Sequence, residues 1–168
     1  AAGIQTRGAS YLIIDRNFFH DNGDNVFCGS SGCVYDNVNR DHAIYTASSN
    51  SLIANNVFAR HRYGWAIQVQ THTGYPSSNL RIMNNTFAHP NPDRDGHIVF
   101  NVGDGEPISN VTIENNIFYN PRNAMIEGTS EHVPGLVIRN NLTTAPQLTT
   151  NLDTTGAVIA GNQLSTNP

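Results

Sequence analysis

Short apolar segments recur along the chain, and each carries an asparagine at a fixed place. Three of them, residues 50–58, 79–87 and 110–118, share the pattern Asn-x-x-Ile-x-Asn-Asn-x-Phe, and weaker copies occupy residues 11–19, 135–143 and 156–164. The matching asparagines, separated by 39, 29, 31, 25 and 21 residues, are Asn17, Asn56, Asn85, Asn116, Asn141 and Asn162. A drifting period of this size is typical of a coil whose turns vary in length. The pattern therefore predicts six rungs.

A second apolar segment lies within the longer intervals, at residues 41–46, 64–69, 96–101 and 123–128. These segments have the length of strands, are rich in Ile and Val, and are bounded by Gly, Pro, Asn and Ser, and no stretch shows sustained helical spacing. Strands that recur in the same order, joined by turns too short for crossover helices, pair in parallel by stacking rung upon rung. The predicted fold is all-β: a parallel β-helix solenoid of about six rungs.

Stacking explains the recurring asparagine, because equivalent residues of successive rungs lie about 4.8 Å apart. At that spacing each side-chain amide can donate to the next one and accept from the previous one. Such a ladder pairs polar groups of the turns that would otherwise be buried without a partner. We therefore expect a structural role for these asparagines and assign them no chemistry.

The same register separates inward from outward positions of the second segment, because side chains alternate along a strand. We expect one inward column and one outward column. The inward column is Ile44, Ile67, Val99 and Ile126, and the outward column is Tyr45, Gln68, Phe100 and Glu127.

Composition excludes two classes of partner. The chain has 168 residues with 9 basic and 13 acidic side chains, a net charge of −4, and no lysine. A net acidic chain offers little to a nucleic-acid backbone, which binds clustered positive charge. Its apolar runs fall far short of the roughly 20 residues of a membrane-spanning helix. The sequence thus predicts neither a nucleic-acid partner nor a membrane span.

The two cysteines, Cys28 and Cys33, are separated by four small residues. A local disulfide is the favoured interpretation, and it would place the protein outside the cell. Two free buried thiols remain an alternative, as does half of a zinc site, which would need two further ligands from elsewhere.

Two phrases carry a resemblance to a known family. Residues 41–46, Asp-His-Ala-Ile-Tyr-Thr, are similar to a recurring His-Gly-Ile-Tyr phrase, and residues 63–68, Tyr-Gly-Trp-Ala-Ile-Gln, to a Gly-Ile-Gln phrase. Both phrases occur in right-handed parallel β-helix proteins of the pectin-lyase-like superfamily, which the chain resembles over nearly its whole length. The resemblance implies a right-handed coil. It leaves function open among polysaccharide lyases, glycoside hydrolases, uronan epimerases and phage tailspikes.

A single domain spanning residues 1–168 is expected. Residues 3–10 already resemble the middle of a rung, and neither terminus offers an obvious capping helix. Because the open end of a β-helix exposes unpaired backbone, the chain is expected to be a fragment of a longer protein or to associate end to end.

Arginine and histidine gather in the turns that precede the second segment. These turns hold Arg40, Arg60, Arg62, Arg94 and Arg122, with His20, His42, His61, His89 and His97 on them or at their border. The opposite turns hold acidic residues and His72 and His132 but no arginine. Guanidinium groups pair with carboxylates, and aromatic rings lie against sugar faces, so this edge suits an acidic polysaccharide.

For β-elimination from a uronate, an enzyme neutralises the carboxylate, removes the adjacent ring proton and protonates the leaving oxygen. We expect Arg60 or Arg62 to neutralise the carboxylate, His42 or His61 to act as the base, and Tyr45 to act as acid or base. The expected substrate-binding residues are Trp65, Gln68, Gln70, Arg94 and Arg122. The structural alternative is that these are solvated turn residues, with His42 hydrogen-bonded at a corner.

Other functions stay open at this stage. Glycoside hydrolysis needs two carboxyl groups about 5 to 9.5 Å apart, and Glu127 would need a partner such as Asp93 or Asp95. Asp93 and Asp95 also suggest a calcium site, although the remaining ligands are missing; no other metal or cofactor is predicted. A non-catalytic carbohydrate-binding or structural β-helix is the alternative to an enzyme.

Overall fold

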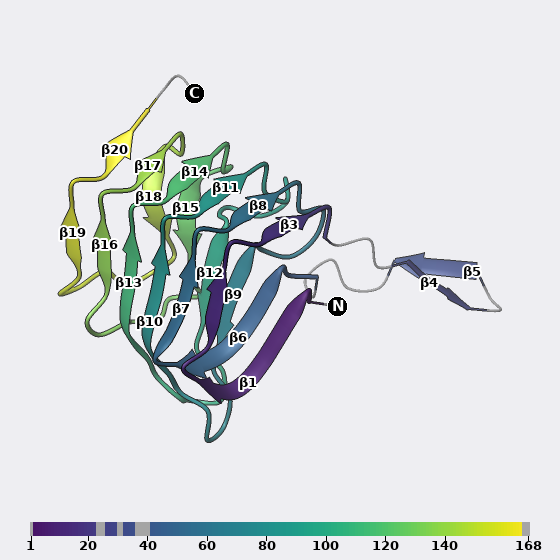
Figure 1. Ribbon diagram of the computed structural model, residues 1–168, viewed down its shortest axis with the longest axis horizontal. Helices are drawn as coiled ribbons and strands as arrows, with labels where there is room; N and C mark the ends of the chain where they lie inside the picture. Colours follow the sequence, from purple (N-terminus) through teal and green to yellow (C-terminus); the bar gives the residue numbers. More distant parts are fainter. Residues whose placement is uncertain (1, 23–25, 30–31, 36–40, 166–168) are drawn as a thin grey trace.

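The computed structural model describes residues 2–22, 26–29, 32–35 and 41–165, with side chains described outside residues 26–35. In these ranges every regular element is a β-strand, and no helix is long and apolar enough to cross a membrane. Three six-stranded parallel sheets run along the molecule, so the predicted six-rung all-β parallel β-helix is confirmed. Figure 1 shows the rungs stacked from β1 to β20.

Each sheet takes one strand from every rung. The first sheet consists of β1 (Ile4–Ser10), β6 (Ile44–Ser49), β9 (Ile67–Gln70), β12 (Ile98–Asn101), β15 (Ala124–Glu127) and β18 (Gln147–Thr150). The second consists of β2 (Ile13–Asp15), β7 (Ser51–Ala54), β10 (Ser77–Met83), β13 (Ile108–Glu114), β16 (Val137–Arg139) and β19 (Val158–Ala160). The third consists of β3 (Phe18–His20), β8 (Val57–Ala59), β11 (Thr86–Ala88), β14 (Ile117–Tyr119), β17 (Leu142–Thr143) and β20 (Gln163–Leu164).

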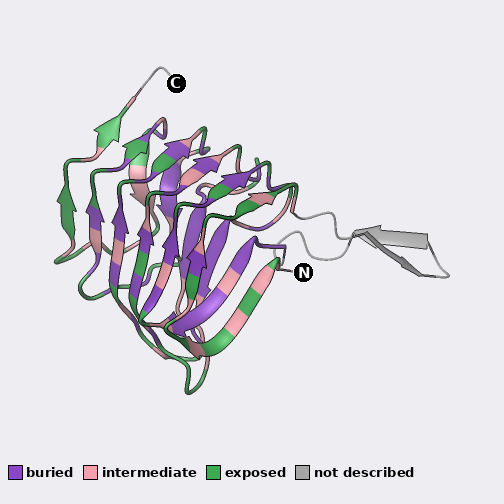
Figure 2. Ribbon diagram, viewed as in Figure 1, coloured by how far each residue is buried: buried purple, intermediate pink, exposed green. Residues whose placement is uncertain are grey.

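The core consists of columns of like side chains. In the second sheet the inward position is isoleucine in every rung: Ile14, Ile53, Ile82, Ile113, Ile138 and Ile159. In the third sheet Phe19, Phe58, Phe87 and Phe118 stack with ring centroids 5.0, 4.8 and 4.6 Å apart. Burial of these side chains drives folding, and Figure 2 shows the buried positions running through the middle rungs.

The predicted asparagine ladder is present at the turn between the second and third sheets. Each Nδ2 donates to the Oδ1 of the next asparagine at 2.9–3.1 Å, from Asn17 through to Asn162. The same Oδ1 accepts the preceding asparagine's backbone N–H, and the second Nδ2 hydrogen reaches a backbone carbonyl, as from Asn85 to Ile53. Both hydrogens of each buried amide are therefore used.

The residue before the ladder position explains why asparagines come in pairs. Asn55, Asn84, Asn115 and Asn140 have φ between 54° and 56°. This left-handed conformation is costly for most L-residues and is tolerated best by Gly, Asn and Asp. The first asparagine of each pair thus permits the turn, and the second joins the ladder.

The predicted inward column is wrong at one rung. Ile98, rather than Val99, aligns with Ile67 and Ile126, while Val99 pairs with Gln68 and Glu127 in the outward column. The observed register places both Ile98 and Phe100 inside, each fully buried. A shift of one residue would turn both large side chains outward, so hydrophobic burial selects the observed register.

The two cysteines lie on a hairpin that follows the first rung. β4 (Val26–Gly29) pairs antiparallel with β5 (Gly32–Tyr35), with Cys28 opposite Cys33. No disulfide is seen in the described part of the chain, and the side chains of these two cysteines lie outside it.

Replacing one ladder amide should destabilise the whole coil. Asn85→Ala removes four hydrogen bonds of a buried amide. Since each buried polar group left unpaired costs about 1–3 kcal/mol, we expect the free energy of unfolding to fall by at least about 3 kcal/mol in urea titrations followed by circular dichroism. Asn84→Gly is the matched control: it keeps the left-handed turn at the exposed neighbouring position, and its effect should stay below about 1 kcal/mol. Equal losses in the two variants would contradict the role of the ladder.

Candidate functional site

The outer face of the first sheet carries one side-chain column that crosses the rungs. Tyr45, Gln68, Val99 and Glu127 pair in register from β6 to β15. His42, Trp65 and Arg94 border this column in the turns that precede the strands, and His72 and Asp104 border it in the turns that follow. The site is therefore built by register: each rung contributes one side chain to a common row.

Trp65 is the centre of the site. Its indole Nε1 donates to Glu127 Oε2 at 2.9 Å, and Glu127 also accepts the backbone N–H of Asp95 at 3.2 Å. Because β12 lies between β9 and β15, this contact carries the ring across Val99, which is only 2% exposed. The guanidinium carbon of Arg94 lies 4.3 Å from the indole centroid, a cation–π contact. An aromatic ring, a cation and a carboxylate thus meet on this face.

Tyr45 and His72 form a second polar group on the same face. The Tyr45 hydroxyl lies 3.0 Å from His72 Nε2, and His72 Nδ1 lies 3.9 Å from Asp104 Oδ2. The second distance is too long for a hydrogen bond but brings a negative charge to the imidazole. Burial raises the pKa of Tyr45, so its phenol is protonated at neutral pH. The pair is arranged for proton transfer between a phenol and an imidazole.

His42 positions both groups. Its Nδ1 accepts the backbone N–H of Trp65 at 3.2 Å, and its ring centroid lies 5.7 Å from that of Trp65 and 5.6 Å from that of Tyr45. Burial lowers the pKa of His42 to about 4, so the ring is neutral at pH 7 with its proton on Nε2. Gly64 makes this approach possible, since a Cβ there would lie 2.7 Å from His42 Nδ1.

His61 and His97 belong to the interior. His61 lies beside Phe58 and is 2% exposed, with no hydrogen-bond partner for either ring nitrogen among the described residues. His97 is fully buried against the stacked rings of Phe87 and Phe118, and its Nε2 lies 3.1 Å from the Tyr119 carbonyl oxygen. Burial lowers the pKa of His61 to about 4 and that of His97 to about 3. Both rings are neutral parts of the core at pH 7.

Residues 1–143 match the family model described as the right handed beta helix region. The chain belongs to this family. No curated protein and no solved structure matches it. Family membership agrees with the three parallel sheets and with the resemblance carried by residues 41–46 and 63–68.

The right-handed β-helix brings only some of the expected site residues together. His42, Tyr45, Trp65, Gln68 and Arg94 share the outer face of the first sheet, and Gln70 joins them by accepting from Gln68 Nε2 at 2.7 Å. These are the residues on which a functional argument can rest.

The other expected residues lie elsewhere in the β-helix. Arg60 makes a two-point ion pair with Asp21, through Nε at 2.9 Å and Nη2 at 2.7 Å. This pair lowers the pKa of Asp21 and raises that of Arg60. Arg62 and Arg122 are exposed on turns after the third sheet. Arg40 lies outside the described residues.

The β-helix also adds a residue that the sequence argument had assigned to the opposite edge. His72 follows β9 in a turn that bends back toward the first rungs, as shown by Tyr75, whose ring faces Gly8 and lies 5.3 Å from Arg7. The direction of a turn is set by its tertiary contacts, so no signal in the sequence pointed His72 at Tyr45. The strand register alone places His72 just after β9, at the border of the outward row, without directing its ring toward Tyr45.

The acidic residues considered for calcium have other contacts. Asp95 Oδ1 accepts from Asn123 Nδ2 at 2.5 Å, and the backbone N–H of Asp93 donates to Asn91 Oδ1 at 3.0 Å. Among the described residues, no group of three or more His, Cys, Asp and Glu side chains is arranged to hold a metal ion. The carboxylate of Asp95 and the backbone N–H of Asp93 thus hold the turn before β12.

The buried imidazoles should make stability depend on pH. Their pKa values are lowered to about 3–4 in the folded chain, whereas a histidine of the unfolded chain titrates near 6.5. Between these values the unfolded chain binds more protons, so the free energy of unfolding falls as pH decreases from about 6.5 toward 4. Asp21 opposes this effect at His61, while His61 and Arg94 reinforce it at His42.

The measurement is urea unfolding at several pH values. His61→Leu should reduce the pH dependence by about one proton, because it removes one buried group that the unfolded chain protonates. An unchanged slope in His61→Leu would show that His61 is not buried as a neutral ring.

Proposed function

We propose that this β-helix is a secreted protein that binds an acidic, uronate-containing polysaccharide along the outer face of its first sheet. The observation that carries the proposal is the Trp65–Arg94 pair, which sets a guanidinium on an indole in the middle of the outward row. Indole rings pack against the apolar faces of sugars, and guanidinium groups pair with carboxylates. One such pair offers both contacts that a uronate ring needs.

Polar groups continue this arrangement along the axis. Arg94 Nε is buried and has no hydrogen-bond partner among the described residues. The amides of Gln68 and Gln70, linked at 2.7 Å, extend the polar row beside Tyr45. Successive rungs are spaced by about 4.8 Å, which is comparable to the rise of one sugar in an extended chain. The row therefore suits a polymer that runs parallel to the helix axis.

The Tyr45–His72 pair favours β-elimination as the reaction on this face. Tyr45 would pass its proton to His72 Nε2, and the phenolate would remove the ring proton beside the carboxylate. The regenerated phenol would then protonate the leaving oxygen as the carbon–oxygen bond breaks and a carbon–carbon double bond forms. The imidazolium, next to Asp104, would return its proton to Tyr45. Arg94 would stabilise the charge that builds on the uronate carboxylate.

Glycoside hydrolysis has less support. Glu127 is the acid of the outward row, and its Oε2 already accepts hydrogen bonds from Trp65 and from Asp95. These two hydrogen bonds occupy the oxygen and tie the carboxylate to the indole and to the turn before β12.

Binding should be visible in the fluorescence of Trp65, since the chain contains a single tryptophan. Oligogalacturonates and oligomers of alginate should change this fluorescence with saturation, and maltooligosaccharides should not. Arg94→Gln should weaken binding at least about tenfold, because a charge-assisted contact is lost. Arg122→Gln, an exposed arginine on a turn of the same edge, is the control and should bind as the parent does. No fluorescence change with any acidic oligosaccharide would contradict the proposal.

The reaction has its own test. Incubation with pectate, alginate and glycosaminoglycans, with and without calcium, should release unsaturated uronate detected by ultraviolet absorbance. Tyr45→Phe and His72→Asn should each lower that rate at least about a hundredfold, in line with loss of general acid–base catalysis, while oligosaccharide binding persists. Binding without any rise in absorbance would overturn β-elimination and leave a carbohydrate-binding β-helix. Loss of both would favour the structural alternative.

A further inference from the structure

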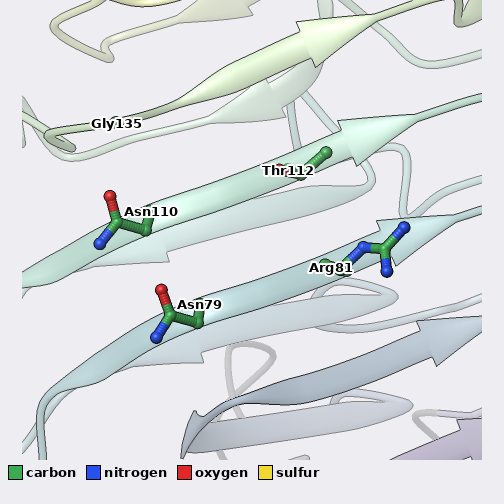
Figure 3. Close-up of a pocket in the computed structure, with 5 residues that line it drawn as sticks. All are labelled: Asn79, Arg81, Asn110, Thr112 and Gly135. Atoms are coloured by element: carbon green, nitrogen blue, oxygen red, sulfur yellow. The ribbon is translucent and has the colours of Figure 1, made fainter.

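The outer face of the second sheet carries a groove that is separate from the site on the first sheet. One hollow of about 260 Å³ is lined by Asn79, Arg81, Asn110, Thr112 and Gly135 (Figure 3). A second hollow of about 360 Å³ shares Asn79 and Arg81 with it and continues past Leu52 to Ile13 and Tyr11. Because the two hollows share residues, they form one groove across the strands. We call it the second-sheet groove.

The groove follows the stacking direction. Ile13, Leu52, Arg81 and Thr112 pair in register on β2, β7, β10 and β13, so they form one outward column. Asn50, Asn79 and Asn110 form a parallel row two residues before this column, each with φ of 51–53°. The contributing side chains repeat at about the 4.8 Å spacing of the rungs. A ligand that matches this groove is an extended polymer.

The polar end of the groove has free hydrogen-bonding capacity. Asn79 Nδ2 donates to Asn50 Oδ1 at 3.0 Å, but no described residue bonds to Asn79 Oδ1 or to the Asn110 amide. Gly135 keeps this end open, because a Cβ at that position would lie 2.3 Å from Asn110 Oδ1. Figure 3 shows the two amides side by side on neighbouring strands. Two adjacent amides of this kind can donate to and accept from sugar hydroxyls.

Charge makes the groove selective. Glu114 is 5% exposed and is bound by Arg139 Nε at 2.7 Å, while Arg81 Nη2 lies 3.4 Å from its other oxygen. The hydrogen bond from Arg139 is the main cause that lowers the pKa of Glu114. Two guanidinium groups thus share one carboxylate, which leaves one net positive charge. Arg81, with its longer bond and half-exposed side chain, retains N–H groups that can bind a second carboxylate.

The other end of the second-sheet groove is apolar. The groove begins at the first rung, where Ile13 is 70% exposed and Tyr11 is 79% exposed. Ile13 is exposed because its side chain points outward from β2. An exposed aliphatic and aromatic surface beside polar groups suits the C–H face of a sugar ring. Together the three features describe one kind of ligand.

We propose that the second-sheet groove binds an unbranched acidic glycan, with a carboxylate on Arg81, hydroxyl groups on Asn79 and Asn110, and a ring face on Tyr11 and Ile13. This site does not depend on the function proposed for the first sheet. It gives the β-helix two polymer-binding faces, so that one molecule can hold a chain on one side and act on a chain on the other.

The test is nuclear magnetic resonance of the isotope-labelled chain titrated with tetragalacturonate and, separately, with neutral maltotetraose. The side-chain amide signals of Asn79 and Asn110 should shift with tetragalacturonate only, and that of Asn115, an exposed asparagine on another turn, should not. Arg81→Gln should raise the dissociation constant read from these shifts at least about tenfold. Arg122→Gln, an exposed arginine on a turn after the third sheet, is the control and should leave the constant as it is in the parent chain.

Further variants separate the two faces. Asn79→Gly and Asn110→Gly keep the left-handed backbone while removing the amides, and each should weaken the shifts. Trp65→Ala should leave them unchanged, which distinguishes this groove from the first-sheet site. The proposal is overturned by absence of shifts at Asn79 and Asn110, by equal shifts with maltotetraose, or by equal weakening in Arg81→Gln and Arg122→Gln.

Discussion

The hydrogen-bonded asparagine ladder is the constraint on which the rest of the molecule depends. A column of buried amides admits one register, since a rung that slipped by one residue would leave donors and acceptors unpaired in a dry interior. Hydrophobic side chains alone specify the register less strictly, because one isoleucine packs on another in several ways. The ladder therefore fixes the position of every strand that follows it in a rung.

Fixed register has consequences on the outside of the coil. When rungs align, residues at equal distances from the ladder stack into rows, and rows of outward side chains become surfaces. The row on the first sheet contains Tyr45 and Glu127, and the row on the second sheet contains Leu52 and Arg81. The repeating rungs hold these side chains at a constant spacing, and the turns add Trp65 and Arg94 to the surface of the first sheet.

The sequence predicted the parts of the structure that repeat and missed the parts that do not. All six ladder asparagines were found from their spacing, because the same short residue pattern recurs in each rung. Val99 was misplaced because that rung has His97 where the two preceding rungs have Ala43 and Ala66, and matching His97 with His42 shifted the alignment by one residue. The observed register of this rung follows from the burial of Ile98 and Phe100 in the core. A comparison of short sequence segments does not take this burial into account.

The same distinction governs the candidate site. Trp65 and Arg94 were selected from residue type and edge, and both lie on the first-sheet face, whereas Arg60 was selected on the same grounds and is bound by Asp21. The difference is that Arg60 has a carboxylate partner on the neighbouring rung. Asp21 and Arg60 are 39 positions apart in the sequence, which hides this proximity. His72 was missed for the converse reason, since its approach to Tyr45 depends on a turn that folds back on the coil. In a β-helix the repeat fixes the positions of the strands, whereas the contacts of each turn with its neighbours fix the positions of the turns. The sequence is therefore least informative about functional residues in turns, and there the structure adds most.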